Sequence, residues 1–180
     1  IKITNHNDPI NVNIFEGDVN ILNQKHGFGM LTTPSSVSIG YWENDEFTGW
    51  GRITKRNGLI LEGKFYRGKL EGKGVVNNGK GGSYVGDFNH SKRHGKGVLD
   101  TSKVHYEGDF VEDKLEGNGN IVFKNEKHFY EGEFSENEIN GYGKFKWNNG
   151  DYYIGQMKNG KMNGKGKYVG KNGKVFIGHF

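Results

Sequence analysis

The chain contains no cysteine, and only 2 of its 180 residues are proline. Without thiols it can form no disulfide, catalytic thiolate or thiolate metal site, which is more typical of a cytosolic protein than of a small secreted one. No segment approaches the run of about 18 apolar residues that a membrane helix needs, and no signal peptide is visible. Only 32% of the residues are hydrophobic, which suits a thin one-layer sheet better than a compact single-core domain.

Glycine, by contrast, is abundant, and it recurs with a period of about 23 residues. One glycine in each period lies inside a strip of alternating large residues: Gly17, Gly40, Gly63, Gly86, Gly108, Gly132, Gly155 and Gly178. A Gly-x-Gly pair follows, at 27/29, 49/51, 72/74, 95/97, 117/119, 141/143 and 164/166. A fixed period over nearly the whole chain predicts a repeat architecture. Near-identical units leave little room for one asymmetric active site, so we expect no enzymatic activity.

Each repeat is predicted to form one β-hairpin. In the strip Tyr106–Phe110 large residues alternate around Gly108, which places them on one face of a strand. Glycine weakens a strand, so its regular presence predicts a close approach of neighbouring rings to the backbone. Polar pairs that suit tight turns follow the strips, among them Asn44-Asp45, Arg67-Gly68, Glu112-Asp113 and Asn159-Gly160. We expect the Gly-x-Gly to open the returning strand, whose core-facing residues would be Leu31, Ile53, Val76, Leu99, Ile121, Phe145 and Tyr168.

A single hairpin buries too little apolar surface to be stable alone, so the hairpins must stack. The predicted fold is all-β: a single-layer, twisted antiparallel meander of about seven consecutive hairpins in an elongated array. Residues 1–14 would be a lead-in strand or the remnant of an earlier repeat. The array would span 15–180, with repeats starting near residues 15, 38, 61, 84, 106, 130 and 153 and a partial repeat at 176–180. Because the chain starts at Ile1 and stops inside a repeat, we expect it to be a piece of a longer protein.

The repeat resembles a known family. Tyr106-Glu107-Gly108-Asp109-Phe110, followed by Gly117-Asn118-Gly119, is similar to the MORN repeat (membrane occupation and recognition nexus). The copies that start at Tyr84, Tyr130 and Tyr153 match as well, and the resemblance covers residues 15–180. The departures from the pattern are Ser38 in place of the opening aromatic residue, one extra residue before Gly27, and a longer turn around Pro34.

The resemblance implies a non-catalytic scaffold that binds proteins in a cytoskeletal, ciliary or membrane-associated assembly, in the cytoplasm or at the cytoplasmic face of a membrane. The partner would be a helix or an extended peptide lying along a groove of the sheet, and self-association is a further expectation. Two alternatives are an anionic phospholipid (phosphoinositide) binding module and an accessory region of a larger enzyme such as a lipid kinase or a methyltransferase. No cofactor is expected.

Two sets of residues are candidates for binding. The residues between the paired glycines should line up along one side of the sheet, and the candidates for a partner groove among them are Phe28, Trp50, Lys73, Lys96, Tyr142 and Lys165. A second apolar set lies two positions before five of the seven Gly-x-Gly pairs, and it either joins the groove or completes the thin core: Phe47, Leu70, Leu115, Ile139 and Met162.

The second candidate set is cationic. Six lysines with no acid among them could bind an anionic partner: Lys158, Lys161, Lys165, Lys167, Lys171 and Lys174. A smaller cluster lies at 92–96. The alternative is a solvated face that keeps the sheet from aggregating.

Several kinds of site are not expected. No helix pattern follows the glycine pairs, so they are not phosphate loops. His90 and His94 are four residues apart in a hairpin, a spacing that favours metal binding only on a helix. No nucleophile triad is apparent, and with few arginines and no recognisable module the chain is not expected to bind nucleic acid.

Overall fold

The computed structural model describes residues 2–4 and 13–180. The chain divides into two compact units, Ile1–Lys92 and Arg93–Phe180. The strands of the first unit are β1 (Lys2–Thr4), β2 (Ile14–Val19), β3 (Lys25–Thr32), β4 (Ser36–Glu43), β5 (Glu46–Lys55), β6 (Ile60–Tyr66), β7 (Lys69–Asn77) and β8 (Ser83–Asn89). The later strands are β9 (Lys92–Asp100), β10 (Val104–Val111), β11 (Lys114–Phe123), β12 (His128–Ser135), β13 (Glu138–Lys146), β14 (Tyr152–Lys158), β15 (Lys161–Val169) and β16 (Val175–His179).

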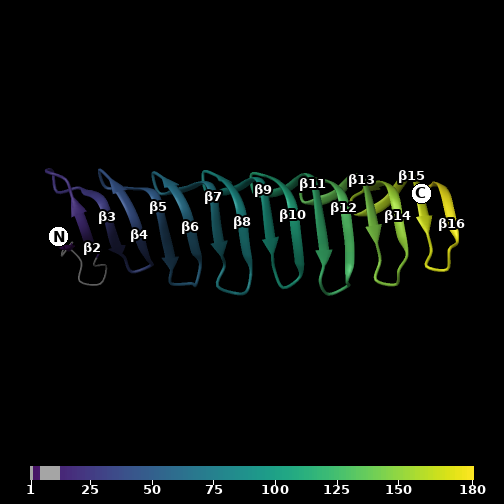
Figure 1. Ribbon diagram of the computed structural model, residues 1–180, viewed down its shortest axis with the longest axis horizontal. Helices are drawn as coiled ribbons and strands as arrows, with labels where there is room; N and C mark the ends of the chain where they lie inside the picture. The colour runs from purple at the N-terminus through teal and green to yellow at the C-terminus, as the bar shows by residue number, and fades with distance from the viewer. Residues whose placement is uncertain (1, 5–12) are drawn as a thin grey trace. The chain divides into compact units, whose positions relative to one another are not determined.

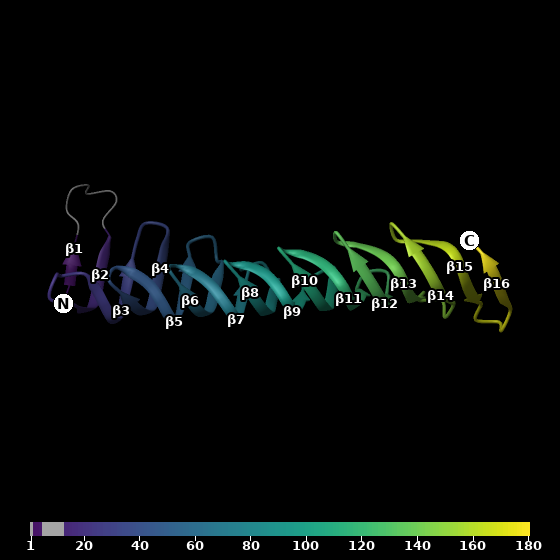
Figure 2. The ribbon, with the colours of Figure 1, turned by 90° about the horizontal axis from the view of Figure 1, so that it is seen from above.

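The predicted all-β hairpin meander is confirmed. Within each unit every strand pairs antiparallel with the next strand of the chain (Figure 1). Seen from above in Figure 2, the strands of each unit form one layer, and no helix covers it in the described residues. Of the expected lead-in, β1 pairs with β2 through Ile3 and Phe15, while residues 5–12 lie outside the described part.

Glycine faces glycine in every described strand pair of the repeats. Gly108 of β10 pairs with Gly119 of β11, which in turn pairs with Gly132 of β12. We call this line of residues the glycine row. In the first unit it consists of Gly17, Gly29, Gly40, Gly51, Gly63, Gly74 and Gly86, and in the second of Gly97, Gly108, Gly119, Gly132, Gly143, Gly155, Gly166 and Gly178.

Aromatic rings cover the glycine row, as predicted. A Cβ atom on Gly108 or Gly119 would collide with the ring of Tyr106, which lies across both backbones. The hydroxyl of Tyr106 donates a hydrogen bond to the carbonyl of Asp109 (3.0 Å), and Tyr84, Tyr130 and Tyr153 do the same three residues ahead. These rings therefore need glycine beneath them, and the hydroxyl of each tyrosine finds a backbone carbonyl of the same strip as its hydrogen-bond partner.

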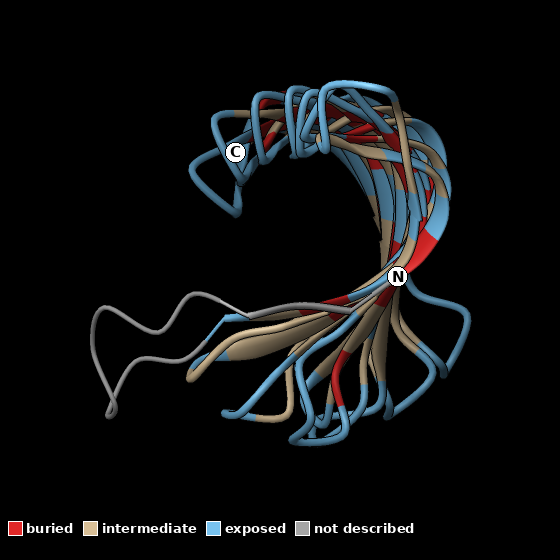
Figure 3. Cartoon of the chain, turned by 90° about the vertical axis from the view of Figure 1, so that its left-hand side faces the viewer, coloured by how far each residue is buried: buried red, intermediate tan, exposed pale blue. Residues whose placement is uncertain are grey.

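In each unit the buried side chains lie in a line on the face that carries the covering rings, and we call this line the ring row. Tyr106 contacts both Phe110 and Phe134 edge-on, with centroids 5.2 and 5.1 Å apart. The row consists of Phe15, Trp42, Phe47, Phe65, Leu70, Tyr84 and Phe88 in the first unit, and of Tyr106, Phe110, Tyr130, Phe134, Tyr153 and Met157 in the second. Figure 3 shows the buried segments within the strands, while most turns are exposed. We call the face of the sheet that carries the ring row the core face, and the opposite one the outer face.

The expectation that the Gly-x-Gly opens the returning strand is wrong. Strand β11 begins at Lys114, three residues before Gly117, because Leu115 still pairs with Phe110. The register then shifts between Gly108 and Phe110, and Gly117 adopts φ +67°. The first glycine of the pair therefore serves a bulge inside the strand, where a left-handed backbone is needed.

The tight turns bind to the preceding repeat. As predicted, both central residues of the turn Glu112-Asp113 have positive φ, 49° and 71°. The backbone amide of Asp113 donates to the carbonyl of Arg93 (3.0 Å), and the amide of Arg93 donates to Oδ1 of Asp113 (3.0 Å). Asn137 and Leu115 make the same reciprocal pair. The second turn residue thus both shapes its own hairpin and connects it to the one before.

Candidate interaction surface

The candidate groove residues lie on the outer face. Neighbours in a strand point to opposite faces, so Asn118, next to Gly119 of the glycine row, points away from the ring of Tyr106. All six candidates named from the sequence are exposed. They form two sets, Phe28, Trp50 and Lys73 in the first unit and Lys96, Tyr142 and Lys165 in the second. The structure therefore groups them on a common face of each unit.

In the first unit the exposed residues are aromatic. Phe28 and Trp50 are 53% and 63% exposed. Phe28 pairs across the strands with Tyr41, 51% exposed, and the two rings meet edge-on with centroids 5.5 Å apart. Ile39, 41% exposed, lies on the same face. Sequence reasoning missed Tyr41 and Ile39, although their parity in the strip around Gly40 already places them opposite the core.

Two of the candidate lysines are neutralised within the sheet. Lys73 pairs with Asp87 across β7 and β8, with Nζ 2.8 Å from the carboxylate. Lys96 pairs with Asp109 in the same way, at 2.6 Å. At these positions the outer face offers ion pairs rather than bare cations, and solvent-exposed pairs of this kind contribute little stability.

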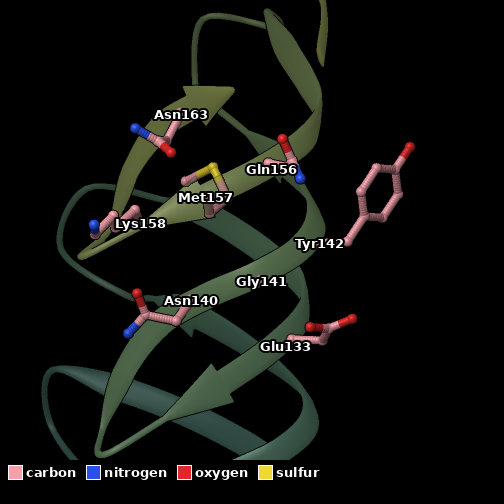
Figure 4. Close-up of a pocket in the computed structure, with 8 residues that line it drawn as sticks. All are labelled: Glu133, Asn140, Gly141, Tyr142, Gln156, Met157, Lys158 and Asn163. Carbon is pink, nitrogen blue, oxygen red and sulfur yellow. The ribbon is translucent and has the colours of Figure 1, made fainter. Parts of the chain in front are cut away.

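Tyr142 stands beside a shallow hollow of about 500 Å³ (Figure 4). In the figure its ring projects away from the strand at Gly141. The hollow is lined by Glu133, Asn140, Gly141, Tyr142, Gln156, Met157, Lys158 and Asn163. Tyr142, 56% exposed, is the one of the six groove candidates that lines this hollow.

The six candidate lysines follow one strand of the second unit. Lys158 and Lys161 face each other beside the turn between β14 and β15, Lys165 and Lys167 lie within β15, and Lys171 and Lys174 lie in the turn after it. We call these six residues the lysine row. All are exposed, and none forms an ion pair with a carboxylate of the described residues.

The second apolar set belongs mainly to the core. Phe47, Leu70 and Ile139 are buried, Leu115 is half-buried, and Met162 is 36% exposed. In two repeats a cation takes this position. Lys25 lies 5.5 Å from the ring centre of Trp42 and pairs with Asp45 at 2.7 Å. The guanidinium of Arg93 lies over Phe110 and pairs with Asp113, so in both cases the charged group lies near a ring and also meets an acid of the next turn.

Few titrating groups are perturbed, and the causes are structural. Burial raises the pKa of Tyr130 to about 12. The pKa of Asp151 lies below its ordinary value because its carboxylate accepts hydrogen bonds from the Tyr168 hydroxyl (2.6 Å), the Lys171 amide and Asn149. The described residues hold no group of three or more side chains suited to a metal ion. They also contain no helix of the length and apolarity that crossing a membrane requires.

The comparison with protein families agrees with this geometry. The MORN repeat model matches residues 21–36, 62–81, 84–102, 106–126, 130–152 and 153–175, which is more than half of the chain. The chain belongs to the MORN-repeat family. The match omits the repeat around Ser38, yet β4 and β5 form the same hairpin there. A comparison with curated proteins finds no match.

MORN repeats are consistent with a repeat protein that binds proteins or membranes. In this MORN protein the two compact units present different outer faces. The first carries exposed aromatic rings and the second carries the lysine row.

Proposed function

We propose that this MORN-repeat protein is a non-catalytic scaffold that binds a protein partner on the outer face of its sheet. The observation that carries the proposal is the exposure of large apolar side chains there, with Phe28, Trp50 and Tyr142 each more than half exposed. The core face already holds a complete ring row, so these residues are not needed to fold the sheet. Exposed aromatic residues flanked by polar groups are effective anchors for a partner.

We further propose that the assembly is cytoskeletal, ciliary or membrane-associated, on the cytoplasmic side. This rests on the family resemblance and not on a particular contact. The tagged full-length protein, imaged in its own cells and fractionated, should co-localise with a filament system or a membrane. A diffuse signal in the soluble fraction alone would contradict the proposed location.

The partner can be identified by crosslinking the full-length protein in its own cells, followed by pull-down and mass spectrometry. We expect crosslinks from Lys73, Lys96 and Lys165 to one protein partner. Recovery of self-crosslinks alone, with the protein in the membrane fraction, would contradict the proposal and favour a lipid-binding oligomer. A kinase or methyltransferase domain elsewhere in the full-length protein would make the array an accessory region.

Variants make the test specific to the outer face. The triple substitution Phe28→Ser, Trp50→Ser and Tyr142→Ser should abolish capture of the partner while the fold is retained. The control Tyr66→Ser and Val111→Ser removes apolar residues that are also exposed but lie at the turn ends of their strands. Equal loss in both variants would show that capture depends on general surface apolarity and not on the positions of Phe28, Trp50 and Tyr142.

A further inference from the structure

The lysine row is a run of six lysines that form no ion pair with a carboxylate of the described residues. Several other lysines are neutralised by carboxylates from neighbouring strands or turns. Lys73 pairs with Asp87, Lys96 with Asp109, Lys124 with Asp100 and Lys114 with Glu136. The six lysines of the row have no such partner in the described part of the chain. A run of like charges is left for an external anion to neutralise.

The central lysines have no acidic side chain as a strand partner. Lys167 pairs with Ile154 on one side and with Ile177, 74% exposed, on the other. Lys165 pairs with His179, and its backbone amide donates to the side-chain oxygen of Gln156. Asp151, at the Lys171 end of the row, already accepts three neutral hydrogen bonds. The middle of the row is thus a cationic strip with an apolar margin.

The spacing of the central lysines fits an extended chain. Lys165 and Lys167 project from the same face of β15, and alternate residues of a strand are about 6.6 Å apart. A partner in the extended conformation with carboxylates at every second residue repeats at the same distance. Its intervening side chains would point away from the sheet.

The middle of the lysine row suits a narrow partner better than a broad one. Glu131 and Glu133 of β12 lie three strands from β15, roughly 14 Å away at the usual strand spacing. A flat anionic membrane wide enough to cover both strands would press these acids against its headgroups. A single peptide chain lying along β15 would avoid them.

We propose that the outer face of β15 binds an extended acidic segment of a protein partner through Lys161, Lys165 and Lys167. The inference rests on the proposed scaffold function and specifies the chemistry of one of its partners. The binding free energy comes from charge complementarity, so the interaction should weaken as salt is added.

The test uses the whole chain and a fluorescein-labelled peptide of alternating glutamate and threonine as the probe. Fluorescence anisotropy should show saturable, salt-sensitive binding, and the same peptide with glutamine for glutamate should not bind. The variant Lys161→Glu, Lys165→Glu and Lys167→Glu should raise the dissociation constant by about tenfold or more. The matched control Lys64→Glu, Lys69→Glu and Lys80→Glu makes the same change of net charge away from the row and should bind as the parent does. Circular dichroism melts establish that both variants are folded.

Several results would overturn the inference. They are absence of probe binding, equal weakening in the control variant, or equal binding of the glutamine peptide. Sedimentation with phosphatidylserine vesicles that depends on the row, without peptide binding, would assign the row to a membrane surface instead. If the crosslinking experiment still recovers a partner while the probe does not bind, only this inference fails. If no partner is recovered from cells, the proposed function itself fails.

Discussion

Phe47 covers Gly40, taking the place that the strip tyrosine holds in the later repeats. A Cβ atom on Gly40 would lie 3.0 Å from Cζ of Phe47, and one on Gly51 would collide with the same ring. The strip residue of this repeat is Ser38, which is buried but too small to reach the glycine row. Leu70 substitutes in the same way over Gly63 and Gly74, where the strip begins with Leu61. The glycine row is therefore covered from whichever end of the hairpin supplies a large side chain.

Removal of the Phe47 side chain should therefore lower the stability of the fold more than its position near a turn suggests. We expect Phe47→Ala to lower the free energy of unfolding by about 3–5 kcal/mol, because no strip aromatic can take over the contact. Urea denaturation followed by tryptophan fluorescence measures the change. The exposed neighbour Tyr41 provides the control, since Tyr41→Ala should change stability by less than about 1 kcal/mol. Similar losses for both would contradict the assigned role of Phe47.

Gly119 should be irreplaceable for lack of space and not for backbone strain. It has no left-handed φ, yet a Cβ would collide with the Tyr106 ring. We expect Gly119→Ala to destabilise by about 1–3 kcal/mol through overpacking. A double-mutant cycle with Tyr106→Leu should reveal a clear favourable coupling, because the smaller side chain makes room for the methyl group. Additive losses would indicate another cause.

High pH should weaken the fold through its buried tyrosines. Burial raises the pKa of Tyr130 to about 12 from its ordinary value of 10.0. The unfolded chain therefore loses this proton at lower pH than the folded one, and the associated stability is complete below pH 10 and is lost as the pH rises toward about 12. Denaturation midpoints measured across that interval should fall. The fall should be smaller in Tyr130→Phe, and an identical slope in the two proteins would contradict the prediction.

Loss of the contact between Lys25 and Asp45 should change the pKa of Asp45 more clearly than it changes the stability of the fold. The side-chain hydrogen bond from Lys25 holds the pKa of Asp45 below its usual value. Lys25→Met removes the charge near Phe15 and Trp42 but keeps an unbranched side chain there, so we expect a loss of less than about 1 kcal/mol. The pKa of Asp45, followed by NMR, should rise toward its ordinary value. Because the pKa of Asp45 is depressed in the folded state, its carboxylate contributes to stability above the pKa of the unfolded chain, and this contribution is lost on acidification. An unchanged titration would show that the hydrogen bond is absent in solution.

The sequence predicted the hairpins well because their determinants are local and repeated. The strip around Gly108 and the turn Glu112-Asp113 each specify geometry within a few residues, and seven copies reinforce the reading. The substitution of Phe47 for the missing ring was not foreseen, since it depends on which side chain reaches the glycine row across the hairpin. The position of Gly117 in a bulge was missed because it depends on the register shift between β10 and β11.

The candidate surface was predicted less completely. Alternation predicted a common side of the strands for Phe28, Trp50 and Tyr142, and all three are exposed, but the register decides which charges meet. Lys73 and Asp87 are 14 residues apart, and only strand pairing shows that they neutralise each other. The absence of carboxylates around Lys165 is likewise a property of the assembled sheet. The partner itself remains a prediction.

The glycine row also constrains how such a chain can change in length. A single residue inserted within a strand would shift the rest of that strand against its neighbours and bring a side chain under a ring, whereas the turns tolerate small differences. The interval from Gly86 to Gly108 is 22 residues and the next, to Gly132, is 24, with the variation confined to the turns. Gain or loss of whole hairpins preserves the alignment of the glycine row. Duplication and deletion of complete hairpins are therefore the natural route by which relatives of this protein would come to differ in the length of the array.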